Sequence, residues 1–543
     1  MNNSFKAVQL SSLAKVFPTE IYGRNASGGN YVRGQDASYQ IALMGQGGEY
    51  TFTVDSELKS TASVYRVGYV PSQLSAYPQA YDDNYLTTEP GLFPDPLFPV
   101  IDGKITLKDG EYLTLWINIL IDKDEKAGEY PVNIRFFKEN IEVGKVTYIL
   151  KIFDATLPEQ TVNFTQWFHT DCIADYHNTE VFSDLHWELI GKYIALATRH
   201  GMTTVLTPVL TPPLDTEVGG ERTTVQLAKI VKLAEGYDID LSLLEKFIDI
   251  ATENGIKNFE INHFFTQWGA RFAPKVIATV DGEEKRIFGW ETDATSPEYA
   301  ELLNCLVPKI IATFEKKGID KTRLYFHVSD EPNGEQLESY RQASSILKPL
   351  ITGCNHMDAL SHFEYYGEGL VSTPVVGSND LEPFIEAGVE NLWCYYCCAQ
   401  ARQVANRFFS MPSARNRIIG AQMYKYGIAG FLHWGYNFYN TQYSKKHISP
   451  YEVTDAGGAF PSGDAFSVYP YENGVIPSLR QKVFKEAIDD IGFLTLAESK
   501  LGKDKVVAIM EDAAKMEITF KQYPKDEEFF SEMYRRLLDA MEI

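Results

Sequence analysis

A repeating order of strand, loop and helix over residues 160–434 constrains the fold of this chain more than any other feature of its sequence. Apolar stretches of strand length alternate there with amphipathic stretches of helical period. The expected strands cover residues 162–168, 203–209, 259–263, 323–328, 359–363, 372–376, 391–397 and 430–434. Alternating strands and helices imply a parallel sheet, and eight such units imply a closed (β/α)8 TIM-like barrel.

The residues before the barrel follow a different rhythm. Alternation of apolar and polar residues, for example in residues 50–54 and 132–136, predicts short strands separated by glycine-rich and proline-rich turns. The chain is therefore expected to combine α and β structure in several domains: an N-terminal β-sandwich over residues 1–158, the barrel over residues 159–482, and a helical C-terminal segment over residues 483–543 that packs on the barrel.

The charge of the chain excludes some partners. Its 73 acidic and 50 basic residues give a net charge of −23. Nucleic acid is excluded because its binding requires clustered Lys and Arg, and an anionic membrane surface is disfavoured for the same reason. No stretch reaches the roughly 18 apolar residues of a membrane span. The first residues lack a signal-peptide pattern, so the chain as given is expected to be cytoplasmic, or secreted or periplasmic if a signal peptide was removed.

The cysteines and histidines do not predict a metal site. Cys394 and Cys397 form a CxxC pattern, but no second CxxC or HxxxH pattern accompanies it, and buried strand thiols are the alternative to a metal or redox role. There is no phosphate-binding loop or GxGxxG pattern. We therefore expect no metal and no cofactor, and the oligomeric state is left open.

The segment with the clearest chemical signal is LYFHVSDEP, residues 324–332. An apolar strand ends there and presents two adjacent carboxylates, Asp330 and Glu331, at the end of a barrel strand where active sites are built. Two close carboxylates are not both ionised cheaply, so one supplies an acid and the other an orienting base. The alternative is that one of them caps the following helix.

The spacing of this pair distinguishes between two kinds of sugar chemistry. Ordinary glycoside hydrolysis uses two carboxylates that face each other across the scissile bond, which sequence neighbours fit poorly. Substrate-assisted hydrolysis fits better, because the 2-acetamido oxygen of the sugar attacks the anomeric carbon. The enzyme then supplies an acid and a group that orients the acetamido N–H.

Several ordered motifs resemble glycoside hydrolase family 123, the β-N-acetylgalactosaminidases. They are HVSDEP at residues 327–332, WFHTD at residues 167–171, WCY at residues 393–395 and GFLHWGYN at residues 430–437. The resemblance implies a β-sandwich before a (β/α)8 barrel. It also implies that Glu331 is the general acid/base, that Asp330 orients the 2-acetamido group and stabilises an oxazolinium-like intermediate, and that anomeric configuration is retained.

Further residues are candidates for binding the sugar. Aromatic faces stack on sugars, whereas Asn, Asp and His side chains bond their hydroxyls. The candidates are His169, Asp171, His263, Trp268, Trp393, Tyr395, Trp434, Tyr436 and Asn437. For Trp393 a place in the core is the alternative, and for His169 and His263 a structural role is.

These inferences predict a retaining, exo-acting β-N-acetylgalactosaminidase that removes terminal β-linked GalNAc from glycans or glycoconjugates. A β-N-acetylglucosaminidase or a broader 2-acetamido hexosidase is the alternative within enzymes, because the two epimers differ by one or two hydrogen bonds. A non-catalytic carbohydrate-binding protein on the same scaffold is the alternative outside them.

Overall fold

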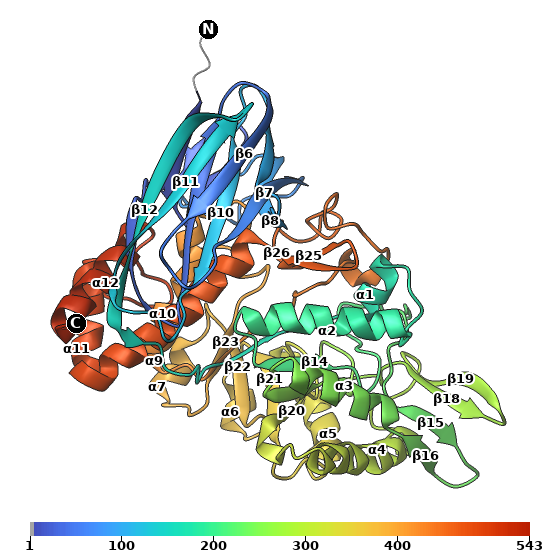
Figure 1. Ribbon diagram of the computed structural model, residues 1–543. Helices are drawn as coiled ribbons and strands as arrows, with labels where there is room; N and C mark the ends of the chain where they lie inside the picture. Colours follow the sequence, from blue (N-terminus) through green and yellow to red (C-terminus); the bar gives the residue numbers. More distant parts are fainter. Residues whose placement is uncertain (1–4) are drawn as a thin grey trace.

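The computed structural model describes residues 5–543 of the chain. A strand-rich N-terminal part lies beside a barrel, and helix α10 (Leu479–Leu501) runs between the two, as Figure 1 shows. This helix contacts the N-terminal strand β8 (Gly91–Pro99) and the barrel helices α8 (Ser413–Arg417) and α9 (Ile419–Tyr426). Residues from both ends of the chain therefore support the barrel.

The N-terminal part is rich in β-strands, as predicted, and most of them form two five-stranded sheets. In spatial order, the first sheet contains β1 (Lys6–Ser11), β5 (Asp36–Met44), β10 (Leu113–Leu120), β7 (Ser63–Ser72) and β8. The second contains β4 (Gly28–Arg33), β12 (Ile141–Thr156), β11 (Gly128–Lys138), β6 (Gly48–Asp55) and β9 (Lys104–Leu107). The short strands β2 (Lys15–Val16) and β3 (Ile21–Tyr22) pair with each other.

Side chains from both sheets share one buried hydrophobic cluster. Tyr39 of the first sheet and Tyr148 of the second stack with ring centroids 4.0 Å apart and nearly parallel planes. The second sheet thus buries one face, which explains the alternation of apolar and polar residues along β6 and β11. The central strands β5 and β10 of the first sheet are buried almost throughout, because the other face of this sheet packs into the hydrophobic cluster of the barrel.

Eight parallel strands close into the predicted barrel. They are β13 (Asn163–Gln166), β14 (Thr204–Thr207), β17 (Asn258–Ile261), β20 (Leu324–Phe326), β21 (Asn355–Leu360), β22 (Thr373–Gly377), β23 (Trp393–Tyr395) and β24 (Gly430–His433). Every one overlaps a strand expected from the sequence. Strand β21 begins four residues earlier than expected, because its polar start, Asn355-His356, interrupts the apolar pattern.

The helices follow from capping and amphipathic spacing. Helix α2 (Asp184–Arg199) begins after Ser183, whose side chain accepts a hydrogen bond from the backbone N–H of His186. The remaining α-helices are α1 (Thr170–Tyr176), α3 (Ser242–Glu253), α4 (Pro297–Lys316), α5 (Leu337–Leu347), α6 (Glu364–Gly367), α7 (Glu382–Glu386), α11 (Lys503–Ala514) and α12 (Glu528–Met541).

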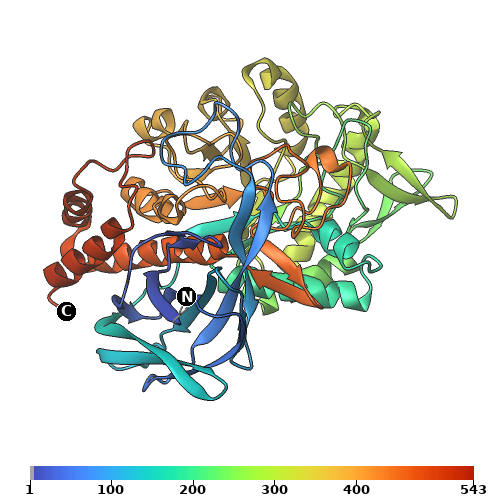
Figure 2. The same ribbon diagram turned by 90° about the horizontal axis from the view of Figure 1, so that it is seen from above.

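A four-stranded sheet beside the barrel was not expected from the sequence. It contains β16 (Tyr237–Asp240), β15 (Lys229–Lys232), β18 (Val276–Val280) and β19 (Glu283–Phe288), and it extends outward at one edge of the barrel in Figures 1 and 2. A further hairpin joins β25 (Val468–Tyr471) and β26 (Gly474–Pro477).

The C-terminal helices begin slightly before the expected boundary at residue 483. The side chain of Ser478 caps α10, so the helix begins at Leu479. Helix α12 packs on α11 and also contacts β4 of the N-terminal part. Within residues 5–543, none of the helices has both the length and the apolar character required to cross a membrane.

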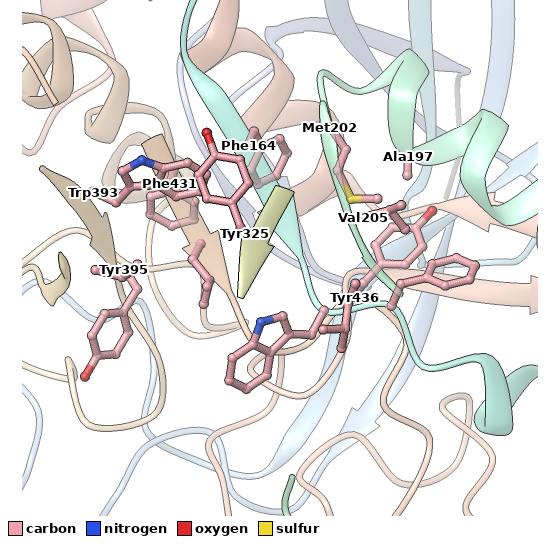
Figure 3. Close-up of a cluster of buried hydrophobic side chains, with 14 of the residues drawn as sticks. Phe164, Ala197, Met202, Val205, Tyr325, Trp393, Tyr395, Phe431 and Tyr436 are labelled. Carbon is pink, nitrogen blue, oxygen red and sulfur yellow. The ribbon is translucent and has the colours of Figure 1, made fainter. Parts of the chain in front are cut away.

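Large aromatic side chains pack together inside the barrel (Figure 3), and those nearest the N-terminal ends of the strands are Phe164, Tyr325, Trp393 and Phe431. The ring of Trp393 lies 5.4 Å from that of Tyr325. The first residue of strand β24, Gly430, lies against the ring of Trp393. A Cβ atom at this position would lie 2.2 Å from a ring carbon of Trp393, so only glycine fits there. These packed rings close the barrel at the N-terminal ends of its strands. A cavity is therefore possible only at the opposite end, where the strands finish.

Candidate active site

A cavity of about 190 Å³ lies at the C-terminal ends of the barrel strands. Asp330 and Glu331, which follow β20, line it together with Tyr395 at the end of β23 and Trp434 just after β24. This is the end of the barrel at which enzymes of this fold place their catalytic groups.

A larger cavity of about 410 Å³ lies between the N-terminal strands and the C-terminal helices. Two of its acidic side chains are in ion pairs: Glu486 with Arg417, also on the wall, at 2.7 Å, and Asp489 with Lys485 at 2.5 Å. Volume alone would select this cavity, but the acidic pair lies in the smaller one. We therefore place the candidate active site in the smaller cavity.

The backbone that carries the acidic pair is fixed by buried acceptors. The N–H groups of Val328 and Ser329 donate to the carboxylate of Asp358, at distances of 3.2 Å and 3.4 Å. The hydroxyl of Ser329 donates to the backbone oxygen of Thr266 at 3.0 Å. Glu331 then adopts a φ of +40°, a left-handed conformation that is costly for this residue and that tends to occur at functional sites.

The helix-cap alternative for the pair is wrong. The first turn after the pair, residues 334–336, is capped by Asn333, whose side chain accepts from the N–H of Glu335 at 3.0 Å. Asp330 and Glu331 lie before this cap, and both carboxyl groups line the cavity.

Burial and mutual repulsion set the charge of the pair. Burial raises the pKa of Asp330 well above its ordinary value, and the charges of Glu331, Asp358 and Asp215 raise it further, although that of His327 opposes them. Burial also raises the pKa of Glu331. The hydroxyl of Tyr395 donates to Oε1 of Glu331 at 2.5 Å. The pair is therefore arranged to retain a proton well above the pH at which exposed carboxyls lose theirs.

A buried network of charged groups lies beneath the pair. His327 bonds Oδ1 of Asp358 through Nδ1 at 3.0 Å and Oε1 of Glu260 through Nε2 at 2.7 Å. The hydroxyl of Tyr340 donates to the other oxygen of Asp358. The indole N–H of Trp167, a residue of the cavity wall, donates to Glu260 at 2.6 Å.

The two carboxylates keep the imidazole of His327 charged. Burial disfavours the cation, but the hydrogen bonds and charges of Asp358 and Glu260 raise the pKa of His327 to about 9. Burial likewise disfavours the Asp358 anion, yet hydrogen bonds from His327 and His356 hold the pKa of Asp358 well below its ordinary value. The network places the charged His327 between the side chains of Asp358 and Glu260, and through Asp358 it holds the loop of the acidic pair.

Among residues 5–543, one group of side chains has the spacing of metal ligands: His263, His327 and Asp358. The rings of the two histidines stack with centroids 4.1 Å apart and planes 19° apart. The lone pair of each imidazole nitrogen lies in the plane of its own ring, so two stacked rings do not point their nitrogens at one common ion. In addition, Nδ1 of His327 is already bonded to Asp358. This arrangement does not suit a tetrahedral metal site.

Four predicted sugar-binding residues line the cavity: His169, Trp268, Tyr395 and Trp434. Trp434 is oriented by Asp464, which accepts from its indole N–H at 2.9 Å. Trp268 is 41% exposed, has a φ of +58° and meets Tyr443 edge to face at 6.0 Å. The nitrogens of His169 are both engaged, one with Arg222 and the other with the backbone oxygen of Trp434, so His169 presents its ring to the cavity rather than a free nitrogen.

The other five predicted residues are placed behind the wall of this cavity. Asp171 forms a bidentate ion pair with Arg222, at 2.8 Å and 2.9 Å. Asn437 clamps the backbone of His169 through both ends of its carboxamide. Trp393 and Tyr436 lie in the packed cluster of Figure 3, and the hydroxyl of Tyr436 donates to the backbone oxygen of Tyr193. His263 is buried against His327.

Sequence reasoning missed several cavity residues that come from loops. Asp215 lines the cavity, and burial raises its pKa to about 6. Its carboxylate accepts from the N–H of Tyr443 at 3.1 Å, and its own N–H donates to Gln267 at 2.7 Å. Asp215 and Tyr443 have φ values of +40° and +60°. The proline-rich stretch before Asp215 marks a loop, but no spacing in the sequence directs it toward the acidic pair.

Comparison with known proteins supports the assignment of the barrel. The model of the glycoside hydrolase 123 catalytic domain matches residues 167–497. No match was found among curated protein sequences. The fold is similar to that of a family 123 glycoside hydrolase from Clostridium perfringens that hydrolyses glycolipid glycans, with a TM-score of 0.74 and 15% identity over 99% of this chain and 98% of that one.

Other solved structures are much less similar. A family 5 xyloglucanase from Bacteroides ovatus has a TM-score of 0.31 and 8% identity over 85% of this chain and 98% of that one. A family 5 mannosidase from Rhizomucor miehei has a TM-score of 0.32 and 8% identity over 64% of this chain and 95% of that one. At these TM-scores the two carry no argument about this chain.

Proposed function

Because this chain belongs to glycoside hydrolase family 123, we propose that it is a retaining, exo-acting β-N-acetylgalactosaminidase that works by substrate-assisted catalysis. The observation that carries the proposal is the adjacent pair Asp330 and Glu331 in an aromatic-walled cavity, with both pKa values raised. The modest cavity volume favours one terminal sugar over a longer stretch of glycan. We also propose that the two N-terminal sheets form a β-sandwich, which their shared hydrophobic cluster supports.

In this mechanism Glu331 is the general acid. Oε1 accepts the hydroxyl proton of Tyr395, so the carboxyl proton of Glu331 resides on Oε2. Glu331 gives this proton to the glycosidic oxygen while the bond from that oxygen to the anomeric carbon breaks. The resulting carboxylate later takes a proton from the water that attacks the anomeric carbon.

Asp330 acts on the acetamido group of the substrate. The acetamido oxygen attacks the anomeric carbon and forms an oxazolinium-like intermediate, while the acetamido N–H donates to the Asp330 carboxylate. As positive charge develops on the acetamido group, the anionic form of Asp330 is favoured over the neutral form that its surroundings otherwise promote. The two attacks, one from the acetamido oxygen and one from water, retain the anomeric configuration.

The remaining wall supplies the sugar contacts. Trp434, Trp268 and Tyr443 offer faces or edges of aromatic rings, and such surfaces stack on the apolar side of a sugar. The structural relative from Clostridium perfringens hydrolyses glycolipid glycans, so we propose the terminal GalNAc of a glycolipid or related glycoconjugate as the substrate class.

The test is a panel of chromogenic β-glycosides that differ at one position: GalNAc, its O4 epimer GlcNAc, and galactose, which lacks the acetamido group. We expect hydrolysis of the GalNAc substrate, weaker hydrolysis of the GlcNAc substrate and no hydrolysis of the galactoside. Preference for GlcNAc would transfer the assignment to a β-N-acetylglucosaminidase. Equal turnover of the galactoside would rule out substrate assistance, and no turnover of any sugar with retained binding would favour a carbohydrate-binding protein.

A further inference from the structure

The proposed mechanism leaves two side chains of the cavity wall unused. Cys397 and Cys398 follow Tyr395 by two and three residues, and both line the cavity that contains Asp330 and Glu331. Cys397 is 8% exposed and Cys398 is half-buried. All six cysteines of the chain are free thiols.

These two thiols are neighbours on one wall of the cavity. The thiol of Cys398 contributes to raising the pKa of the Cys397 thiol and also that of the Tyr77 hydroxyl, which comes from the N-terminal part. The backbone is fixed on both sides, because the N–H of Cys397 donates to Gln400 at 2.8 Å and its carbonyl oxygen accepts from Asn406 at 2.9 Å. The two cysteines therefore lie next to each other on a segment of backbone that is already fixed, which lowers the cost of engaging both thiols at once.

We propose that Cys397 and Cys398 form a two-thiol binding site for soft, thiophilic ligands of the monosubstituted trivalent arsenical type, and that an occupant of this site blocks the sugar cavity. Soft thiol ligands select soft metals and metalloids. With phenylarsine oxide, two S–H bonds break and two As–S bonds form, and the arsenic-bound oxygen leaves with both protons as water. Arsenic remains trivalent throughout, so no oxidant or reductant is required.

The same surroundings disfavour attack by reagents that bind one thiol. The neighbouring Cys398 thiol and burial raise the pKa of Cys397 well above its ordinary value, and burial also raises the pKa of Cys394. Alkylating reagents react with the thiolate, which is therefore scarce at neutral pH. Condensation with the arsenical consumes neutral thiols, so we expect it to proceed where a maleimide of similar size reacts slowly.

The experiment titrates the full-length protein with phenylarsine oxide and measures arsenic per chain by elemental mass spectrometry alongside residual glycosidase activity. We expect one arsenic atom per chain, loss of activity in step with binding, and recovery with 2,3-dimercaptopropanol but not with a monothiol at the same concentration. Cys397→Ser and Cys398→Ser should each weaken arsenic binding by about a hundredfold or more, because the second bond is no longer intramolecular.

Two matched variants serve as controls. Cys305→Ser and Cys354→Ser remove thiols that are also partly buried but lie elsewhere, and they should leave arsenic binding unchanged. If Cys398→Ser does not fold, Cys397→Ser and protection of the wild type by a bound sugar inhibitor test the same point. Arsenic binding that survives both substitutions, or binding without loss of activity, overturns the proposal. The arsenic count does not depend on which sugar is cleaved, so it is distinguishable from a failure of the proposed function.

Discussion

Two buried sets of charged groups in this molecule have opposite arrangements. Where the N-terminal part meets α10, Asp95 accepts from Arg480 at 2.9 Å and 2.8 Å and from the hydroxyl of Tyr469 at 2.5 Å. In the cavity, the groups that act on the pKa of Asp330 are three acidic residues, Glu331, Asp358 and Asp215, against one cation, His327. The first arrangement satisfies its charges and joins two parts of the fold, whereas the second leaves a proton to be transferred.

Of the substitutions that distinguish the cavity acids from the paired charges around Asp95, Glu331→Gln is expected to have the largest effect on activity. Glutamine keeps the shape and accepts from Tyr395 but has no acidic proton, so kcat should fall by about 10²- to 10⁴-fold, the usual contribution of general acid catalysis. Because a repulsive carboxyl is removed, the melting temperature should stay the same or rise. Kinetics on the aryl β-GalNAc substrate and thermal unfolding measure both quantities.

The matched control for this substitution is Glu335→Gln, which changes an exposed carboxylate four residues further along the same loop. It should leave kcat unchanged. Full activity in Glu331→Gln would show that Glu331 is not the general acid. A strongly lowered melting temperature would show that the charge of Glu331 stabilises the fold, as that of Asp95 does.

The reverse pattern is expected for Asp95→Asn. This change leaves the buried guanidinium of Arg480 without its counter-charge, which should cost about 3–5 kcal/mol of the free energy of unfolding. Turnover per folded molecule should change little, since Asp95 lies outside the cavity. Denaturant unfolding measures the loss, and Asp83→Asn provides the control, because the exposed pair of Asp83 with Lys525 should contribute less than about 1 kcal/mol.

Asp358→Asn should combine both effects, because Asp358 pairs with His327 and also holds the loop of the acidic pair. Misplacement of catalytic groups by even about 1 Å can reduce the rate about a hundredfold, and we expect a kcat loss of that order. The control is Tyr340→Phe, which removes one hydrogen bond to Asp358 but leaves its charge.

The pH dependence of stability tests the same pair independently. The pKa of His327 is raised to about 9, so its contribution to stability is fully present below about pH 6.5 and is lost as the pH rises through about 9. In Asp358→Asn this decline in melting temperature should flatten. An unchanged decline would mean that Asp358 does not hold the charge of His327.

The barrel could be predicted because its strands are continuous apolar runs with helices between them. The four-stranded sheet was missed because β15 and β19 read KIVK and EEKRIF, in which charged residues hide the apolar pattern. Those strands depend on pairing with their neighbours more than on burial, and single-sequence patterns do not record pairing.

In the candidate site, too, the residues on strands could be predicted from the sequence, whereas the contacts made by loops could not. Asp330, Glu331, Tyr395 and Trp434 were predicted, since each stands at the end of a recognisable strand. Asp171 was expected near the sugar, but Arg222, 51 residues further along the chain, pairs with it behind the wall of the cavity. Interactions of this kind depend on how loops return to the barrel, which no local spacing specifies.

The smallest effect is expected from Asp215→Asn. This substitution tests whether Asp215, a third acidic residue of the cavity wall, behaves like the cavity acids or like the paired structural charges. Burial raises the pKa of Asp215 to about 6, compared with about 3.9 for an exposed Asp. Above that range the folded protein contains a poorly solvated anion, so the wild type is less stable than the variant. At about pH 4 and below, the group is protonated and the difference vanishes.

Asp215→Asn should therefore raise the free energy of unfolding by about 1–2 kcal/mol at about pH 8 and leave it unchanged near pH 4. The charge of Asp215 also raises the pKa of Asp330, so the acid limb of the activity profile should shift to lower pH in the variant. Asp238→Asn, at an exposed position of β16, should change neither quantity. A variant less stable than the wild type at high pH would mean that Asp215 belongs with the paired structural charges, as Asp95 does, because only a carboxylate with a compensating partner stabilises the fold in its ionised form.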